Sequence, residues 1–131
     1  MTTANQERIL IIGRSVPLIE GVADLLQVVG YPVELSSGWV EAEYARRDVP
    51  PSLIIVDLSM AAPDVYPLAE EIRRTPRWGD VPILFLSFSG DDRIRDLQRR
   101  NRRNGDSNLH FYAHTLLSMD ELLQTVRACL S

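Results

Sequence analysis

The sequence predicts an α/β protein in which helices cover both faces of a parallel β-sheet. Short apolar runs that suit buried strands alternate along the 131-residue chain with longer segments whose apolar residues recur at helical spacing. Five such strand–helix units follow one another, which is the order typical of a parallel sheet. Neither a repeat nor a linker interrupts them, so we expect a single domain over residues 1–131.

The first strand–helix unit shows the local signals most clearly. Its strand is predicted at Arg8–Ile12. Ser15 is expected to cap the helix that follows, with Pro17 in the first turn and Gly30 as the stop signal. The apolar residues of this helix recur every three or four positions, the spacing of one buried face. The predicted inward face consists of Leu18, Val22, Leu25, Leu26 and Val29.

The later units are predicted from the same kinds of signal. Their strands are expected at Val33–Ser36, Leu53–Val56, Val81–Ser87 and Leu109–Ala113. Their helices are expected at Trp39–Arg47, after the cap Asp64, at Asp91–Asn104, and after Ser118, which forms a capping box with Glu121. The predicted inward residues of the last three helices are Val65, Leu68, Ala69 and Ile72, then Ile94 and Leu97, then Leu122, Val126, Cys129 and Leu130. Trp39 and Trp78 are expected at the rims of the sheet.

The composition excludes several classes of site. All 14 basic residues are arginines, so a lysine Schiff base, a P-loop lysine and a catalytic lysine–carboxylate pair are excluded. The net charge of -4 gives no global reason to expect a nucleic-acid partner. Cys129 is the sole cysteine, which excludes an internal disulfide. With His110 and His114 it leaves too few ligands for a structural zinc site.

The polar start of the chain and its short apolar runs favour a cytoplasmic protein. Residues Thr2–Arg8 lack the basic and then apolar layout of a secretory signal. A run such as Ile9–Ile12 is far too short to cross a bilayer. The last predicted helix reaches the end of these 131 residues. We therefore expect no effector domain here, whether the chain acts alone or belongs to a larger protein.

The residues that leave the predicted strands define a candidate site. In open parallel sheets, ligands bind beyond the carboxyl ends of the strands, because helices cover both faces. The polar or small residues expected at that edge are Gly13, Arg14, Asp57, Ser59, Ser87, His114 and Thr115.

This part of the sequence resembles a known family. The segment LIIVDLSM (Leu53–Met60) resembles the phosphoacceptor strand of two-component response-regulator receiver domains of the chemotaxis-regulator type. The agreement continues in RRTPRWGDVPILFLS, which ends at Ser87, and in the final SMDELLQTVRACL. The resemblance implies a flavodoxin-like (βα)5 three-layer sandwich with the sheet order 2-1-3-4-5. It also implies that Asp57 is the phosphoacceptor and that Ser87 and Tyr112 are the switch residues.

The sequence departs from this family at specific positions. Family members carry two acidic residues where this chain has Gly13 and Arg14, and a lysine where it has Thr115. Mg²⁺ would then be held by Asp57 and the Ser59 carbonyl alone, with Arg14 repelling the ion. We therefore expect no cofactor and an ion pair between Arg14 and Asp57 that fills the pocket.

Three functions stay open. In the first, the chain is a degenerate pseudo-receiver that signals through protein–protein contacts and is not an enzyme. In the second, a histidine kinase phosphorylates Asp57 at an altered Mg²⁺ site, and the chain passes the signal to a downstream effector. Its enzymatic activity is then at most self-phosphorylation or dephosphorylation at Asp57. In the third, the crevice at the strand ends binds a small ligand.

A cluster of arginines is the other candidate for a binding surface. Its members are Arg95, Arg99, Arg100, Arg102 and Arg103. One interpretation is a solvated, partly disordered loop, as charge runs usually are. The other is a patch that attracts an acidic protein partner, with nucleic acid as a less favoured ligand.

Overall fold

The computed structural model contains one five-stranded parallel sheet. It describes residues 7–14, 16–46, 49–58, 65–87, 92–105, 107–113 and 119–130. The strands are β1 Ile9–Ile12, β2 Val33–Ser36, β3 Leu53–Asp57, β4 Ile83–Ser87 and β5 Leu109–Ala113. They lie in the order β2-β1-β3-β4-β5, which confirms the predicted order 2-1-3-4-5.

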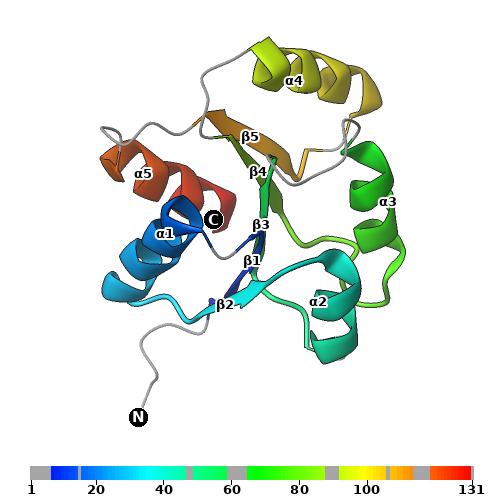
Figure 1. Ribbon diagram of the computed structural model, residues 1–131. Helices are drawn as coiled ribbons and strands as arrows, with labels where there is room; N and C mark the ends of the chain where they lie inside the picture. The colour runs from blue at the N-terminus through cyan, green and yellow to red at the C-terminus, as the bar shows by residue number, and fades with distance from the viewer. Residues whose placement is uncertain are drawn as a thin grey trace.

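Helices cover both faces of this sheet (Figure 1). They are α1 Pro17–Val28, α2 Trp39–Arg46, α3 Tyr66–Arg74, α4 Asp92–Asn104 and α5 Met119–Leu130. One core cluster joins the sheet to α1 and α5, and the other joins it to α2, α3 and α4. The predicted three-layer α/β sandwich is therefore confirmed. No helix in the described segments is both long and apolar enough to cross a membrane.

The buried face of α1 differs from the predicted one. Ile19, Val22 and Leu26 are buried, whereas Leu18 is 40% exposed and Val29 is 38% exposed. Ile19, Val22 and Leu26 follow one another at spacings of three and four residues. A stripe through Leu18 has the same kind of spacing. The prediction for Leu18 and Val29 was wrong because two overlapping apolar stripes satisfy the pattern and spacing alone does not choose between them. The predicted inward residues of α4 and α5 are buried or half-buried, as expected.

The helix starts also differ in detail from the prediction. Val16 occupies the N-cap position of α1 and Val65 that of α3, and neither makes a side-chain capping bond. The predicted caps Ser15, Asp64 and Ser118 lie outside the described residues. The predicted stop at Gly30 is confirmed. This residue has a φ of 107°, which favours glycine, and its N–H donates to the Gln27 carbonyl over 3.0 Å.

The two tryptophans lie in the core rather than at the sheet rims. Trp78 is fully buried and Trp39 is 7% exposed, and their rings meet edge to face with centroids 5.3 Å apart. Trp78 lies in the turn between α3 and β4, and Trp39 is the first residue of α2. The pair therefore joins two helices on one face of the sheet, and the prediction of a rim position was wrong.

Helix α4 is attached to the body of the protein by polar groups as well as apolar ones. Only Ile94 and Leu97 are buried apolar residues of this helix. The buried hydroxyl of Tyr66 in α3 donates to the Leu97 carbonyl over 2.8 Å. The side-chain amide of Gln98 donates to the Phe111 carbonyl of β5 over 3.4 Å. Helix α4 thus lies against the β5 edge of the sheet (Figure 1).

Tyr66→Phe is expected to lower the free energy of unfolding by about 1 kcal/mol, because it deletes this buried hydrogen bond and little else. Thermal unfolding followed by circular dichroism should show a melting temperature about 3–5 °C lower. Tyr31→Phe is the matched control, since Tyr31 is half-buried on the opposite face, and it should leave the melting temperature unchanged. Equal effects of the two substitutions would contradict a role for the Tyr66 hydroxyl in holding α4.

Candidate functional site

Asp57 is buried at the carboxyl end of β3, with 1% of its surface exposed. The strand that leads to it, Leu53–Val56, is fully buried and pairs with β1 on one side and β4 on the other. This pairing fixes the backbone of Asp57 opposite Leu86 of β4. The structure thus places a carboxylate at the sheet edge where the sequence predicts a site.

Gly13 lies directly beside Asp57 at the end of β1. A Cβ atom added to Gly13 would lie 3.1 Å from the Cβ of Asp57 and 3.6 Å from the side chain of Ile19. The Gly13 N–H donates to the Ser36 carbonyl over 2.9 Å, which fixes this part of the backbone. Glycine therefore allows β1 and β3 to end in close contact, since position 13 adds no side chain beside Asp57.

Arg14 is exposed, in contrast to buried Asp57. The structure gives no ion pair between these two residues within the part of the chain that it describes. The expected pairing of Arg14 with Asp57 is therefore not observed.

Ser87 and Tyr112 lie on the two strands beyond Asp57. Ser87 is 6% exposed and directly follows Leu86, the residue of β4 that pairs with Asp57. Tyr112 of β5 pairs with Leu86 and is half-buried, and its hydroxyl donates to a carboxylate oxygen of Glu121 in α5 over 3.4 Å. The remaining predicted site residues, Ser59, His114 and Thr115, lie outside the described residues.

A cleft lies beside Gly13, at the sheet edge where the sequence predicts a crevice, but its other lining residues were not among the predicted site residues. Its volume is about 530 Å³, and it lies at the carboxyl ends of β1 and β2. The polar residues that line it are Glu34, Ser36, Ser37 and Glu41, and the Ser37 hydroxyl donates to a carboxylate oxygen of Glu41. The signal that could have revealed it is the polar residues within and after the second predicted strand, an edge strand whose side chains helices cover incompletely.

The arginines of the predicted patch all lie on α4 and are exposed: Arg95, Arg99, Arg100, Arg102 and Arg103. The interpretation of this segment as a loop was wrong, because the segment is helical through Asn104. The helix is ended by Gly105, which has a φ of 77° and donates its N–H to the Asn101 carbonyl over 2.8 Å.

Comparison with curated proteins finds relatives among transcriptional regulators. The chain is 28% identical over 125 residues to the DNA-binding dual master transcriptional regulator RpaA of Synechocystis, covering 94% of this chain and 48% of that protein. It is 32% identical over 95 residues to the probable transcriptional regulator ycf27 of Pyropia yezoensis, covering 71% of this chain and 38% of that protein. The chain thus spans about half the length of RpaA and less of ycf27. No protein-family model matches the sequence.

Solved structures with the same fold include parts of signalling proteins. A sensor protein from Polaromonas sp. JS666 superposes with a TM-score of 0.75 and 17% identity, covering 96% of this chain and 97% of that one. The receiver domain of a sensor histidine kinase from Pseudomonas aeruginosa PAO1, solved with a magnesium ion coordinated in its active-site cleft, superposes with a TM-score of 0.67. It shares 22% identity, covering 95% of this chain and 97% of that one.

The described residues around Asp57 offer few ligands to a magnesium ion. Mg²⁺ binds through near-octahedral oxygen ligands, usually one or two carboxylates with waters and substrate phosphate. At the end of β1 this chain offers a glycine in contact with Asp57 and an exposed arginine. Among the described residues, no group of three or more His, Cys, Asp or Glu side chains is placed to hold a metal ion. The described part of the site is therefore a buried, single carboxylate with a hydroxyl on the neighbouring strand.

Proposed function

Because this chain is a response-regulator receiver domain, of the kind found in two-component regulatory systems, we propose that it is a pseudo-receiver that signals through protein contacts. The observation that supports the proposal is that Gly13 puts no carboxylate beside Asp57, at a position where even a Cβ atom would lie 3.1 Å from the Asp57 Cβ. Chemistry at Asp57 is then not the step that controls the signal.

The physical argument concerns charge. Transfer of a phosphoryl group depends on positioning and on neutralising the negative charge of its oxygens, more than on covalent help from the protein. Asp57 is itself negative, and the residue after Gly13 is an arginine whose side chain is exposed. A guanidinium can pair with an anion, but it cannot arrange water and phosphate oxygens in an octahedron as a metal ion does.

The proposed partners are proteins, namely a histidine kinase and a downstream effector. RpaA is named as DNA-binding, but this chain covers only 48% of its length. The chain itself has a net charge of -4, which does not favour contact with a nucleic acid over its whole surface.

Incubation with acetyl phosphate is expected to leave most of the protein unmodified, with or without MgCl₂. Intact-mass spectrometry measures the fraction that gains one phosphoryl group, and Asp57→Asn supplies the background. Stoichiometric, Mg²⁺-dependent modification that Asp57→Asn abolishes would contradict the proposal.

That contradicting result would instead support a second function, a working phosphoacceptor with an altered site. The observation that favours it is the placement of Asp57, Ser87 and Tyr112 at the ends of three adjacent strands. Asp57 and Ser87 are buried. A phosphoryl group on Asp57 would therefore change the surroundings of Ser87 on the neighbouring strand. The labelling experiment separates the two functions, because only the second requires a modified aspartate.

A further inference from the structure

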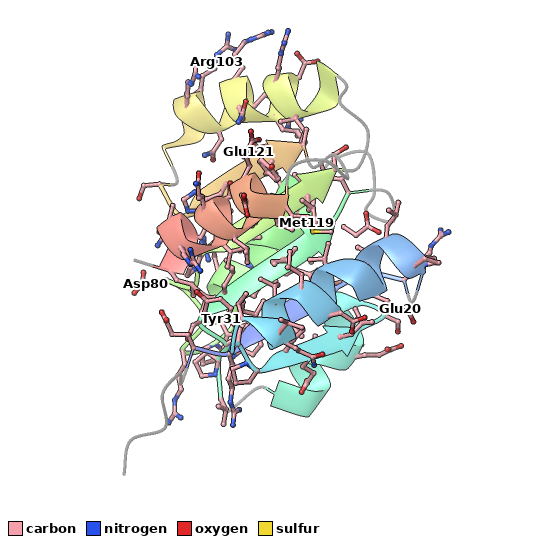
Figure 2. The ribbon with its side chains drawn as sticks, turned by 90° about the vertical axis from the view of Figure 1, so that its left-hand side faces the viewer. Glu20, Tyr31, Asp80, Arg103, Met119 and Glu121 are labelled. Carbon is pink, nitrogen blue, oxygen red and sulfur yellow. The ribbon has the colours of Figure 1, made fainter. Side chains whose placement is uncertain are left out.

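A cavity lies at the amino ends of the strands, at the opposite edge of the sheet from Asp57. Its volume is about 240 Å³, and the starts of β1 and β2 line it. The two edges can be located in Figure 2: Tyr31 and Asp80, which precede β2 and β4, lie toward one end of the sheet, and Glu20, near the start of α1, lies toward the other. The cavity is therefore separate from the site around Asp57.

The wall of this cavity is mainly apolar. Its apolar residues come from the starts of β1 and β2 and from the segment before β3: Ile9, Leu10, Pro32, Val33, Val49 and Pro51. Backbone hydrogen bonds join these segments, since the Ile9 N–H donates to the Pro32 carbonyl over 2.9 Å and the Ser52 N–H donates to the Arg8 carbonyl over 2.8 Å. An apolar cavity of about 150 Å³ is large enough to bind benzene. This larger cavity therefore has room for a branched aliphatic or aromatic group.

Two side chains of opposite charge, Arg8 and Glu34, also line the cavity. Arg8 is exposed, and its guanidinium forms no ion pair with a residue in the described ranges. Glu34 is half-buried, and its backbone is fixed by pairing with Leu10 of β1. A carboxylate has about four acceptor positions, so Glu34 can accept hydrogen bonds from a ligand in addition to the interaction that it makes within the protein. The cavity thus offers a donor, an acceptor and an apolar wall to one small molecule.

We propose that this cavity binds a free α-amino acid with an apolar side chain. Such a molecule carries a carboxylate and an ammonium group next to an apolar body, which matches the two charges and the apolar wall. The planar guanidinium of Arg8 can bind the carboxylate through two parallel hydrogen bonds, and Glu34 can accept from the ammonium group.

Ligands with a single charge fit this cavity less well. An acid without an ammonium group would bring its carboxylate toward Glu34 with nothing to offset the repulsion. An amine without a carboxylate would likewise bring its positive charge toward Arg8. The proposed site is remote from Asp57, so the proposal does not depend on the function proposed above.

L-Leucine is the probe, and heteronuclear NMR of the full chain measures its binding through the backbone amide resonances. The natural chain should bind leucine with a Kd of about 1 mM or below, a usual affinity for so small a ligand. The largest shifts should fall at the starts of β1 and β2. Isocaproate, which lacks the ammonium group, and isoamylamine, which lacks the carboxylate, should each bind about tenfold more weakly or worse. Glycine, which lacks the apolar side chain, should also bind about tenfold more weakly or worse.

Arg8→Gln removes the positive charge at an exposed position and keeps the backbone bond to Ser52. It should weaken leucine binding about tenfold and should not weaken isoamylamine binding, because the amine has no carboxylate for Arg8 to hold. Val49→Phe leaves both charged groups in place and narrows the cavity at a half-exposed position. It should also weaken leucine binding about tenfold.

The control variant Arg74→Gln makes the same change in net charge at an exposed arginine of α3 that does not line the cavity. It should bind leucine within about twofold of the natural chain. Equal weakening by Arg8→Gln and Arg74→Gln would overturn the proposal, because the effect would then follow net charge. The absence of amide shifts at about 20 mM leucine would overturn it as well. Isocaproate or isoamylamine binding as tightly as leucine would also overturn it, in favour of a ligand with one charge.

Discussion

Gly13→Asp is expected to lower the free energy of unfolding at neutral pH by about 2 kcal/mol or more, because the new side chain crowds a buried carboxylate. Even a bare Cβ at position 13 would lie 3.1 Å from the Cβ of Asp57, which is 1% exposed. The second carboxylate adds like-charge repulsion at a place that water reaches poorly. Scanning calorimetry should show a melting temperature about 6 °C lower or more.

Gly13→Asn separates crowding from charge, since the two side chains have nearly the same shape. It should keep the steric cost and lack the repulsion, so its melting temperature should lie between those of the natural chain and Gly13→Asp. If Asn and Asp at this position were equally destabilising, repulsion from Asp57 would have no part in the effect.

The melting temperature of Gly13→Asp should also be measured with MgCl₂. Two neighbouring carboxylates are a better ligand set for Mg²⁺ than one, and a ligand that binds only the folded state raises its stability. Millimolar MgCl₂ should therefore raise the melting temperature of Gly13→Asp and leave that of the natural chain unchanged. An equal rise in the natural chain would show that its site already binds the ion, which contradicts a degenerate site.

The fold could be predicted from the sequence because the strand signals, the helix signals and their alternation along the chain all indicate the same architecture. Runs such as Leu53–Val56 are apolar on both faces, which only a strand between two helical layers requires. The inward face of α1 could not be chosen, because stripes through Leu18 and through Ile19 have the same spacing. The core position of Trp78 could not be predicted either, since it lies in a turn, where no periodicity indicates which side is buried.

The candidate site could be located but not described from the sequence. Parallel strands end at one edge, so the positions of Gly13, Asp57 and Ser87 near each other follow from topology. The topology does not determine where a side chain points. Arg14 illustrates this, because the sequence predicts that it approaches Asp57 and the structure shows it exposed. A long flexible side chain at a strand end can turn to solvent, where its charge is better hydrated, and Arg14 does so.

Trp78→Ala is expected to lower the free energy of unfolding by about 3–5 kcal/mol, the usual cost of removing a large buried aromatic ring. Trp78 is among the largest fully buried side chains, and its ring contacts that of Trp39 at 5.3 Å. Since stabilities of single domains are about 5–15 kcal/mol, this loss would be a large share of the total. Urea unfolding followed by circular dichroism measures it.

The Trp78→Ala substitution should also affect the edge of the sheet near Gly13. Trp39 begins α2 and is separated by Gly38 from Ser36 and Ser37, which line the cleft beside Gly13. A cavity in place of Trp78 removes the ring against which Trp39 packs, so amide hydrogen exchange should rise at the start of α2 before it rises in β3. Trp78→Phe keeps an aromatic contact and should lose less than half as much stability. Leu18→Ala, at an exposed position of α1, should lose almost none. A loss for Trp78→Ala as small as that for Leu18→Ala would contradict the packing of α2 and α3 described above, because it would mean that the tryptophan ring does not hold the two helices together.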